Sequence, residues 1–298
     1  MPLDLEASKS TLLPADEVSR WVRAAIDEDR GAGDLTSEHA IDPELQARAR
    51  LVAKAPGVLA GTQLFDEAFR ACDPASTLQW RAQDGDRIEP GDEICEVVGK
   101  ARALLLAERT ALNFLQRLCG VATATAQLVE LAAGRVRVLD TRKTTPGLRA
   151  AQKYAVICGG GENHRFGLFD QVMLKENHID MSGLSCEALT AKVRSQVGPH
   201  IVMTVEARDA DEARQALRGG ADVVMLDNMT PETIKALIPE LRALAQSTGR
   251  PVQFEASGGI DAKSMADYAA SGIDRISVGA LTHSAPSLDL SLYVEPIR

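Results

Sequence analysis

Long apolar segments and the spacings of common metal and redox sites are missing from this sequence of 298 residues. No stretch approaches the roughly 18 uninterrupted apolar residues of a membrane span, so we expect no membrane-spanning helix. The five histidines show neither HxH nor HExxH spacing, and a GxSxG motif is absent, which argues against a zinc site and a serine nucleophile. The five cysteines, at positions 72, 95, 119, 158 and 186, form no CxxC pair. Isolated thiols in a chain of this length predict free cysteines in a reducing compartment, so we expect a cytoplasmic protein.

An excess of positive charge is also missing, because 33 lysines and arginines stand against 42 acidic residues, for a net charge of −9. Nucleic-acid binding needs a basic surface, so the composition argues against it. Between residues 141 and 165, however, five basic side chains stand against the single acid Glu162. Such a run is most often a solvated surface, but in an acidic protein it also suggests a focused site for a small anion. The basic residues of the run are Arg142, Lys143, Arg149, Lys153 and Arg165.

The first 118 residues follow no regular alternation of strands and helices. Residues 17–29 have the apolar spacing of an amphipathic helix, and residues 45–59 and 78–98 contain strand-like stretches with regular turn signals. No lysine stands at a hairpin tip between matching halves, so a swinging-arm carrier domain is not expected. We therefore expect a structural β-layer in this part of the chain.

A long helical pattern over residues 101–119 carries one basic side chain near its apolar face. Leu105, Leu112 and Leu115 define that face. Arg109 lies four residues after Leu105 and three before Leu112, so we expect its side chain close to the face. A guanidinium group there is unfavourable unless it meets an anion, either a carboxylate of the protein or a bound ligand.

Beyond residue 120 the pattern becomes regular, with six short apolar runs separated mostly by helical stretches. Strands that alternate with helices predict a parallel sheet. Two further units needed for a closed eightfold barrel are not recognisable, so we expect an incomplete α/β barrel. The six runs are residues 136–139, 172–174, 201–205, 223–226, 252–254 and 276–278.

Charged, hydroxyl or glycine residues follow each of the six runs, and the carboxyl ends of barrel strands are where active sites form. The presence of such residues after all six runs favours an enzyme over a structural barrel. The arginines among them suit a carboxylate or phosphate ligand, because the guanidinium group forms two parallel hydrogen bonds with it. The acids can hold ribose hydroxyls or hydrated magnesium, and the glycine turns let a phosphate approach the backbone. The set comprises Arg142, Lys143, His164, Arg165 and Lys175 as cations, Glu206 and Asp227 as acids, and the turns at Ser257–Gly259 and Val278–Ala280.

Several motifs in this order resemble the quinolinate phosphoribosyltransferase family over nearly the whole chain. The most specific are DTRKTTPGLR at residues 140–149 and GGENHRFGLFD at residues 160–170. The resemblance implies an N-terminal α/β sandwich domain and a C-terminal open α/β barrel. We place the sandwich at residues 1–118, with a tail at 287–298 that can pack with it, and the barrel at 119–286. Further matches are EDRGAGDLTS (28–37), ERTALNFLQR (108–117), KENH (175–178), VE (205–206), LDN (226–228), SGGI (257–260) and VGALTH (278–283).

The same resemblance implies a reaction and a set of residue roles. The enzyme would be a pentosyltransferase that joins quinolinate to phosphoribosyl pyrophosphate and releases pyrophosphate and carbon dioxide, giving nicotinate mononucleotide for NAD synthesis. Mg²⁺ would accompany the donor, and no organic cofactor is expected. The family implies a homodimer with shared active sites, or a higher oligomer built from it, in which Arg109 reaches the partner's barrel.

Each site residue takes its expected role from the family. Lys143 is the expected acid for protonation at C2, with Glu206 and Asp227 as the other catalytic residues and as the residues that hold magnesium, directly or through water. The quinolinate and donor site is expected to comprise Arg109, Thr141, Arg142, Lys143, His164, Arg165, Lys175, Glu206 and Asp227. The 5′-phosphate is expected at Ser257, Gly258, Gly259, Val278, Gly279 and Ala280.

Three other functions remain open from the sequence. One is a relative that acts on another substrate, such as a molybdate-locus paralogue or a nicotinate-specific phosphoribosyltransferase, although the full dicarboxylate-binding set argues against a monocarboxylate. A non-catalytic ligand sensor on the same barrel would bind both ligands without turnover, and the presence of Lys143 and Asp227 argues against it. A purely structural barrel is disfavoured, because unpaired cations near its core would be unfavourable.

Overall fold

The computed structural model describes residues 13–297, which fall into two compact units. The N-terminal unit comprises residues 13–126, 146–160 and 284–297. The barrel unit comprises residues 127–145 and 161–283. Within the described residues, no helix is long and apolar enough to cross a membrane.

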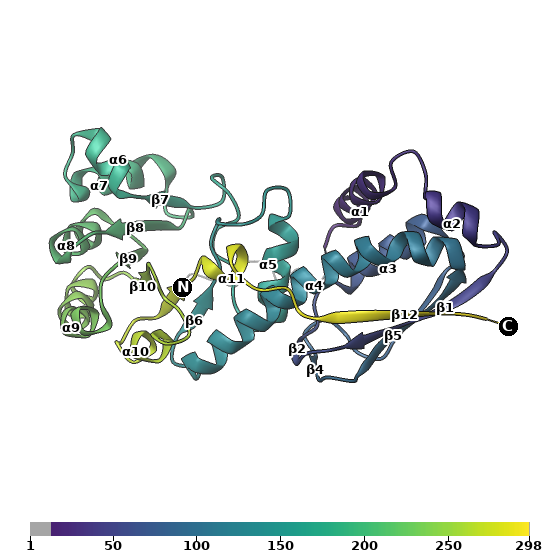
Figure 1. Ribbon diagram of the computed structural model, residues 1–298. Coiled ribbons are helices and arrows are strands. Elements are labelled where there is room, and N and C mark those ends of the chain that lie inside the picture. The colour runs from purple at the N-terminus through teal and green to yellow at the C-terminus, as the bar shows by residue number, and fades with distance from the viewer. Residues whose placement is uncertain (1–12, 298) are drawn as a thin grey trace. The chain divides into compact units, whose positions relative to one another are not determined.

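The N-terminal unit is built on a four-stranded antiparallel sheet with the order β12-β1-β5-β3, accompanied by helices (Figure 1). Alternate residues of β1 are buried, so one face of the strand packs in the core. The last strand of the chain, β12, pairs with β1 over seven residues. The strands are β1 (Gln46–Ala53), β3 (Thr77–Trp80), β5 (Glu93–Lys100) and β12 (Leu290–Pro296), with a small ladder of β2 (Gly57–Val58) and β4 (Arg87–Ile88). The helices are α1 (Ala15–Arg30), α2 (Leu35–Ala40), α3 (Thr62–Cys72), α5 (Arg149–Cys158) and the first part of α4 (Ala101–Ala132).

Aromatic packing and one carboxylate fix α3 in this unit. Phe65 and Phe69 are fully buried one turn apart, and the Phe65 ring lies 5.3 Å from the ring of Trp80 on β3. Asp84 accepts hydrogen bonds from the backbone N–H groups of Gly61 and Thr62, which satisfies donors at the start of the helix. These contacts explain how the expected β-layer becomes a sheet covered by helices.

The barrel unit contains a six-stranded sheet with the order β6-β11-β10-β9-β8-β7, in which every pairing is parallel. Among the described residues no pairing joins β7 to β6, so the barrel is open, as the sequence predicts. The strands are β6 (Arg137–Leu139), β7 (Val172–Leu174), β8 (Met203–Ala207), β9 (Val223–Asp227), β10 (Gln253–Ser257) and β11 (Arg275–Ser277). The helices are α6 (Glu176–Ser182), α7 (Cys186–Val197), α8 (Ala210–Gly219), α9 (Pro231–Ser247), α10 (Met265–Ala269) and α11 (Ala280–His283).

Helix starts in the barrel unit follow the local sequence. The side chains of Ser185, Asp209 and Thr230 accept hydrogen bonds from backbone N–H groups at the starts of α7, α8 and α9. Pro231 occupies the first position of α9, where its missing N–H has no partner to lose. Because each helix begins after a strand of a parallel sheet, the carboxyl ends of all six strands gather at one edge.

Gly120 in α4 tests how tightly the N-terminal unit is packed. A Cβ atom at this position would lie 1.9 Å from the backbone oxygen of Pro286. Alanine is the better helix former by about 1 kcal/mol, so helix propensity alone predicts that Gly120→Ala is stabilising. We expect the opposite, a loss of about 1–3 kcal/mol from overpacking against backbone, measured as a lower urea midpoint of unfolding.

The matched control for this change is Gly134→Ala, because a Cβ atom there meets nothing within 4 Å and only the positive φ of 70° opposes it. We expect the control to lose less stability than Gly120→Ala. A Gly120→Ala protein as stable as the wild type would contradict the packing argument.

Candidate active site

A cavity of about 630 Å³ opens at the carboxyl ends of the barrel strands. It is lined by every expected site residue except Arg109. The structure therefore brings the cations, the acids and the glycine turns together, although they are separated by up to 139 positions in the sequence. The lining residues are Thr141, Arg142, Lys143, His164, Arg165, Met173, Lys175, Glu206, Met225, Asp227, Asn228, Ser257, Gly258, Gly259, Ile260, Asp261, Ser277, Val278, Gly279, Ala280 and His283.

Arg165 is the most buried arginine of the cavity wall. It is 8% exposed, and its Nη1 donates a hydrogen bond to the backbone oxygen of Gln171 at 3.2 Å. Its Nε is buried without a hydrogen-bond acceptor among the described residues. Burial lowers the pKa of Arg165, and the nearby charge of Arg142 lowers it further. A buried guanidinium with unused donors beside a second cation is suited to binding an anion.

The acids lie on neighbouring strands and differ from free carboxylates in their protonation. Glu206 is 5% exposed and forms an ion pair with Lys175, whose Nζ lies 2.5 Å from Oε2. Burial and a hydrogen bond with Glu176 raise the pKa of Glu206 to about 7, although Lys175 opposes the shift. Burial also raises the pKa of Asp227, which accepts a hydrogen bond from the Asn228 side chain at 2.5 Å. This part of the site can therefore both accept hydrogen bonds and exchange a proton near neutral pH.

Two glycine turns give the cavity an open backbone surface. Gly258 and Gly259 have φ values of 103° and 62°, and a Cβ at Gly258 would lie 2.2 Å from the Asn228 side-chain oxygen. A Cβ at Gly279 would lie 2.9 Å from the Lys143 side chain, so this lysine runs alongside the second turn. The Thr282 hydroxyl donates to the Lys143 backbone oxygen at 2.8 Å and fixes that contact. Such turns allow a phosphate to approach backbone N–H groups closely.

A layer of charged residues beneath the cavity was not predicted from the sequence. Asp140 is fully buried and accepts a hydrogen bond from the backbone N–H of His164 at 2.9 Å. Glu255, also fully buried, lies between Arg275 and the ring of His164. For Glu255, the sequence shows only an acid shortly before the glycine turn at Ser257–Gly259, and such an acid looks like an ordinary residue at the end of a strand.

Further lining residues were also missed by the sequence reasoning. Met173 and Met225 lie within strands, and alternation along β7 and β9 could have assigned them to the cavity side. Asn228 directly follows β9 and His283 is the last residue of α11, but neither received a role from the sequence. Asn228 adopts a positive φ of 55°, an unusual conformation for a residue other than glycine.

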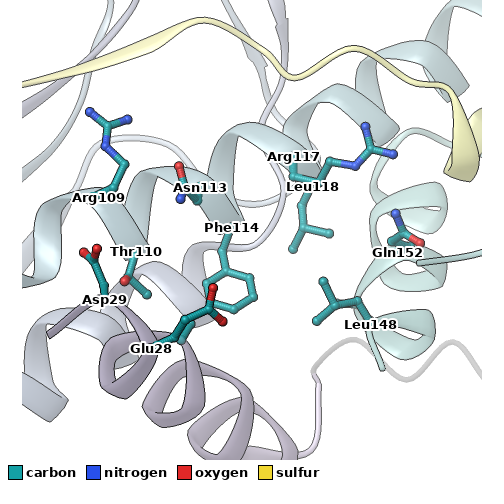
Figure 2. Close-up of a pocket in the computed structure, with 12 residues that line it drawn as sticks. Glu28, Asp29, Arg109, Thr110, Asn113, Phe114, Arg117, Leu118, Leu148 and Gln152 are labelled. Atoms are coloured by element: carbon teal, nitrogen blue, oxygen red, sulfur yellow. The ribbon is translucent and has the colours of Figure 1, made fainter. Parts of the chain in front are cut away.

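Arg109 lies outside the barrel cavity, on an exposed position of α4 in the N-terminal unit. It lines a separate pocket of about 320 Å³ whose walls come from α1, α4 and α5, with the acids Glu28 and Asp29 of α1 (Figure 2). Leu105, expected on a buried face with it, is 37% exposed. Leu112 and Leu115 are buried as expected, but Leu105 lies at the solvent edge of the face, so Arg109 stands beside the apolar face on its exposed side.

Comparisons with known proteins match the chain in both parts. Residues 34–119 match the family model of the quinolinate phosphoribosyl transferase N-terminal domain, and residues 121–293 match that of its C-terminal domain. A Bacillus subtilis protein named probable nicotinate-nucleotide pyrophosphorylase (carboxylating) is 43% identical over 268 residues, which cover 90% of each chain. The chloroplastic nicotinate-nucleotide pyrophosphorylase (carboxylating) of Arabidopsis thaliana is 36% identical over 95% of this chain and 84% of its own. The solved nicotinate-nucleotide pyrophosphorylase of Francisella tularensis is 38% identical, with a TM-score of 0.88 over 97% of this chain and 99% of its own.

The raised pKa of Glu206 predicts a pH-dependent stability. Its proton is held more tightly in the folded state than in the unfolded chain, so its contribution is complete below the ordinary pKa of 4.5 and is lost as pH rises through about 7. We expect the urea midpoint of the wild type to fall relative to that of Glu206→Gln across this interval. The control is Glu240→Gln, because Arg214 lowers the pKa of Glu240 and moves its titration out of the interval. A constant difference between wild type and Glu206→Gln would show that Glu206 does not titrate there.

Proposed function

Because this chain belongs to the quinolinate phosphoribosyltransferase family, we propose that its barrel cavity is the site where quinolinate and phosphoribosyl pyrophosphate react. The products are nicotinate mononucleotide, pyrophosphate and carbon dioxide, and the reaction serves NAD synthesis. The observation that carries this conclusion is the meeting of four lysines and arginines, His164, two acids and two glycine turns in one cavity at the strand ends. The cations suit the carboxylates of quinolinate. The acids suit the ribose hydroxyls of the donor, and the glycine turns suit its phosphate.

The cationic wall is proposed to hold the two carboxylates of quinolinate. Arg142 and Arg165 can each form two parallel hydrogen bonds with a carboxylate, and Lys175 adds a point charge. Thr141 and His164 complete this wall in the family assignment. The number of cations fits a dicarboxylate better than a monocarboxylate such as nicotinate, because an unmatched buried cation would be unfavourable.

The donor is proposed to lie across the acids and the glycine turns. Glu206 and Asp227 accept hydrogen bonds from ribose hydroxyls, and the turns at Ser257–Gly259 and Val278–Ala280 receive the 5′-phosphate. Among the described residues there is no group of three or more potential metal-ligating side chains. The two carboxylates therefore fit a Mg²⁺ ion that arrives with the donor and keeps phosphate oxygens and water as its other ligands. Bound there, Mg²⁺ would neutralise charge on the departing pyrophosphate.

The proposed chemistry depends on orientation and on the positive charge of the cavity. The bond between C1 of ribose and pyrophosphate breaks, and the quinolinate nitrogen forms a bond with C1. The ring nitrogen is then cationic, so the C2 carboxylate can leave as carbon dioxide and its electron pair remains on C2 beside the positive charge. A proton delivered to C2 completes the reaction. Lys143 is proposed as its source, because its side chain runs alongside Gly279 between the phosphate turn and the cations.

Arg109 leads to a proposal about assembly. It is exposed in one chain and lies outside the barrel cavity. We propose a homodimer in which Arg109 of one subunit completes the cavity of the other. The subunits are proposed to work in the cytoplasm, in keeping with the free cysteines.

Turnover is the first experiment. Purified protein given quinolinate, phosphoribosyl pyrophosphate and Mg²⁺ should release pyrophosphate and carbon dioxide in equal amounts, and chelation of Mg²⁺ should stop both. Nicotinate in place of quinolinate should give little pyrophosphate and no carbon dioxide. Binding of both substrates without turnover would favour a sensor, and turnover of nicotinate would favour the alternative enzyme.

Mixing of inactive variants tests the shared site. Arg109→Ala and Lys143→Ala should each lose most activity. After random exchange of subunits, half of the dimers carry one site with both changes and one with neither, so about a quarter of the wild-type activity should return. A mixture no more active than its parents, in a protein shown to exchange subunits, would mean that Arg109 acts within its own chain or not at all.

A further inference from the structure

Glu255 is a fully buried carboxylate directly beneath the wall of the active-site cavity. Its Oε2 accepts a hydrogen bond from Nε of Arg275 at 2.6 Å, and its Oε1 lies 3.5 Å from Nε2 of His164. We propose that Glu255 is a positioning residue that fixes the ring of His164 and, through that ring, the position of Arg165. This role rests on the proposed function, in which Arg165 binds a carboxylate of quinolinate.

The ring of His164 is oriented from both of its nitrogen atoms. Nδ1 accepts a hydrogen bond from the backbone N–H of Arg165 at 2.6 Å, which requires the ring proton to be on Nε2. Nε2 faces the carboxylate of Glu255, so the negative charge favours the same tautomer. Meanwhile Asp140 accepts the backbone N–H of His164 at 2.9 Å. The His164–Arg165 pair is thus held by two buried acids, Asp140 at the backbone of His164 and Glu255 at its ring.

Glu255 is suited to this role because it keeps its charge. Burial alone raises the pKa of Glu255, but the charge of Arg275 and the ring N–H of His164 outweigh it and lower the pKa to about 2. Arg275 is only 4% exposed and is itself held, since its Nη1 donates to Gln253 at 3.4 Å. Arg137 donates to the same Gln253 oxygen at 2.8 Å, so the anchor extends over β6, β10 and β11.

A purely structural ion pair would explain only half of this arrangement. Arg275 satisfies one oxygen of Glu255, whereas the other oxygen is directed at a histidine of the cavity wall. Buried ion pairs contribute little net stability compared with apolar packing, so stability alone is a weak reason for a charge here. A carboxylate behind a histidine sets the ring's tautomer and orientation, which is what a pre-organised binding residue needs.

Steady-state kinetics of Glu255→Gln test the role. The amide keeps the shape of the side chain but removes its charge. The ring of His164 then loses its fixed orientation, and Arg165 loses the fixed hydrogen-bond acceptor for its backbone N–H. We expect KM for quinolinate to rise about tenfold or more, while KM for phosphoribosyl pyrophosphate changes by less than about twofold. The matched control is Glu212→Gln, which removes a mostly buried carboxylate on α8 that pairs with Arg208 and is absent from the cavity lining. An unchanged KM for quinolinate, or equal rises in both KM values, overturns the proposal.

Nitrogen NMR of the histidine rings gives a second test that does not depend on turnover. In the wild-type protein the ring of His164, assigned by comparison with His164→Asn, should carry its proton on Nε2 with Nδ1 unprotonated. A ring protonated on Nδ1, whether neutral or charged, overturns the proposal even if Glu255→Gln fails to fold. If the protein does not use quinolinate but the Nε2–H tautomer is found and is lost in Glu255→Gln, the proposed reaction fails while the positioning of His164 by Glu255 is supported.

Discussion

Repulsion among the cations at one edge of the sheet is the interaction on which the rest of the barrel site depends. Arg142, Arg165 and Lys175 line one cavity, where partial burial makes like-charge repulsion stronger than in water. The lowered pKa of Arg165 records this cost, because burial and the charge of Arg142 both act against its protonated form. A fold that holds these side chains in place must therefore place buried acids behind the cavity wall and leave space in the cavity for an anionic ligand.

The buried acids supply that charge in two different ways. Glu255 remains ionised beneath the wall, since Arg275 and His164 lower its pKa to about 2. Glu206 at the cavity surface has a pKa of about 7, so it changes its charge in the neutral range. Glu255 is thus a fixed charge of the scaffold, while Glu206 can gain or lose a proton near neutral pH. The strand order produces this division, because β10 presents Glu255 to its neighbour β11, whereas β8 presents Glu206 to the open cavity.

The sequence predicted the open barrel and the residues of its cavity because both follow from strand ends. Polar residues after apolar runs mark the carboxyl edge of a parallel sheet, and this rule collected residues as distant as Thr141 and Ala280. The rule fails inside the strands. The run at 201–205 was expected to end before Glu206, but β8 spans Met203–Ala207 and all five residues are buried. A central parallel strand is covered on both faces, so its composition does not show where it ends or which buried acid has a partner.

Contacts between distant segments also lay beyond the sequence. Glu255 and Arg275 are twenty positions apart, and each alone looks like an ordinary strand residue. Residues 146–160 begin inside the DTRKTTPGLR motif of residues 140–149 but group with the N-terminal unit, and no change of composition marks that transition. The sequence also did not show that Arg109 is exposed. A helical pattern identifies the apolar face of a helix, but it does not show how much of that face the core covers.

A dicarboxylate with a phosphorylated donor is the charge that the cavity lacks. Glu206 holds Lys175 in an ion pair, while Asp140 and Glu255 hold His164, which precedes Arg165 in the chain. These contacts exist in the protein alone, so we expect anion binding to require little rearrangement of this wall. Fixed charges of this kind stabilise a developing charge more effectively than solvent, which must reorient during the reaction. Bound anions would relieve the repulsion among these cations, so the geometry of the cavity favours ligands with several negative charges.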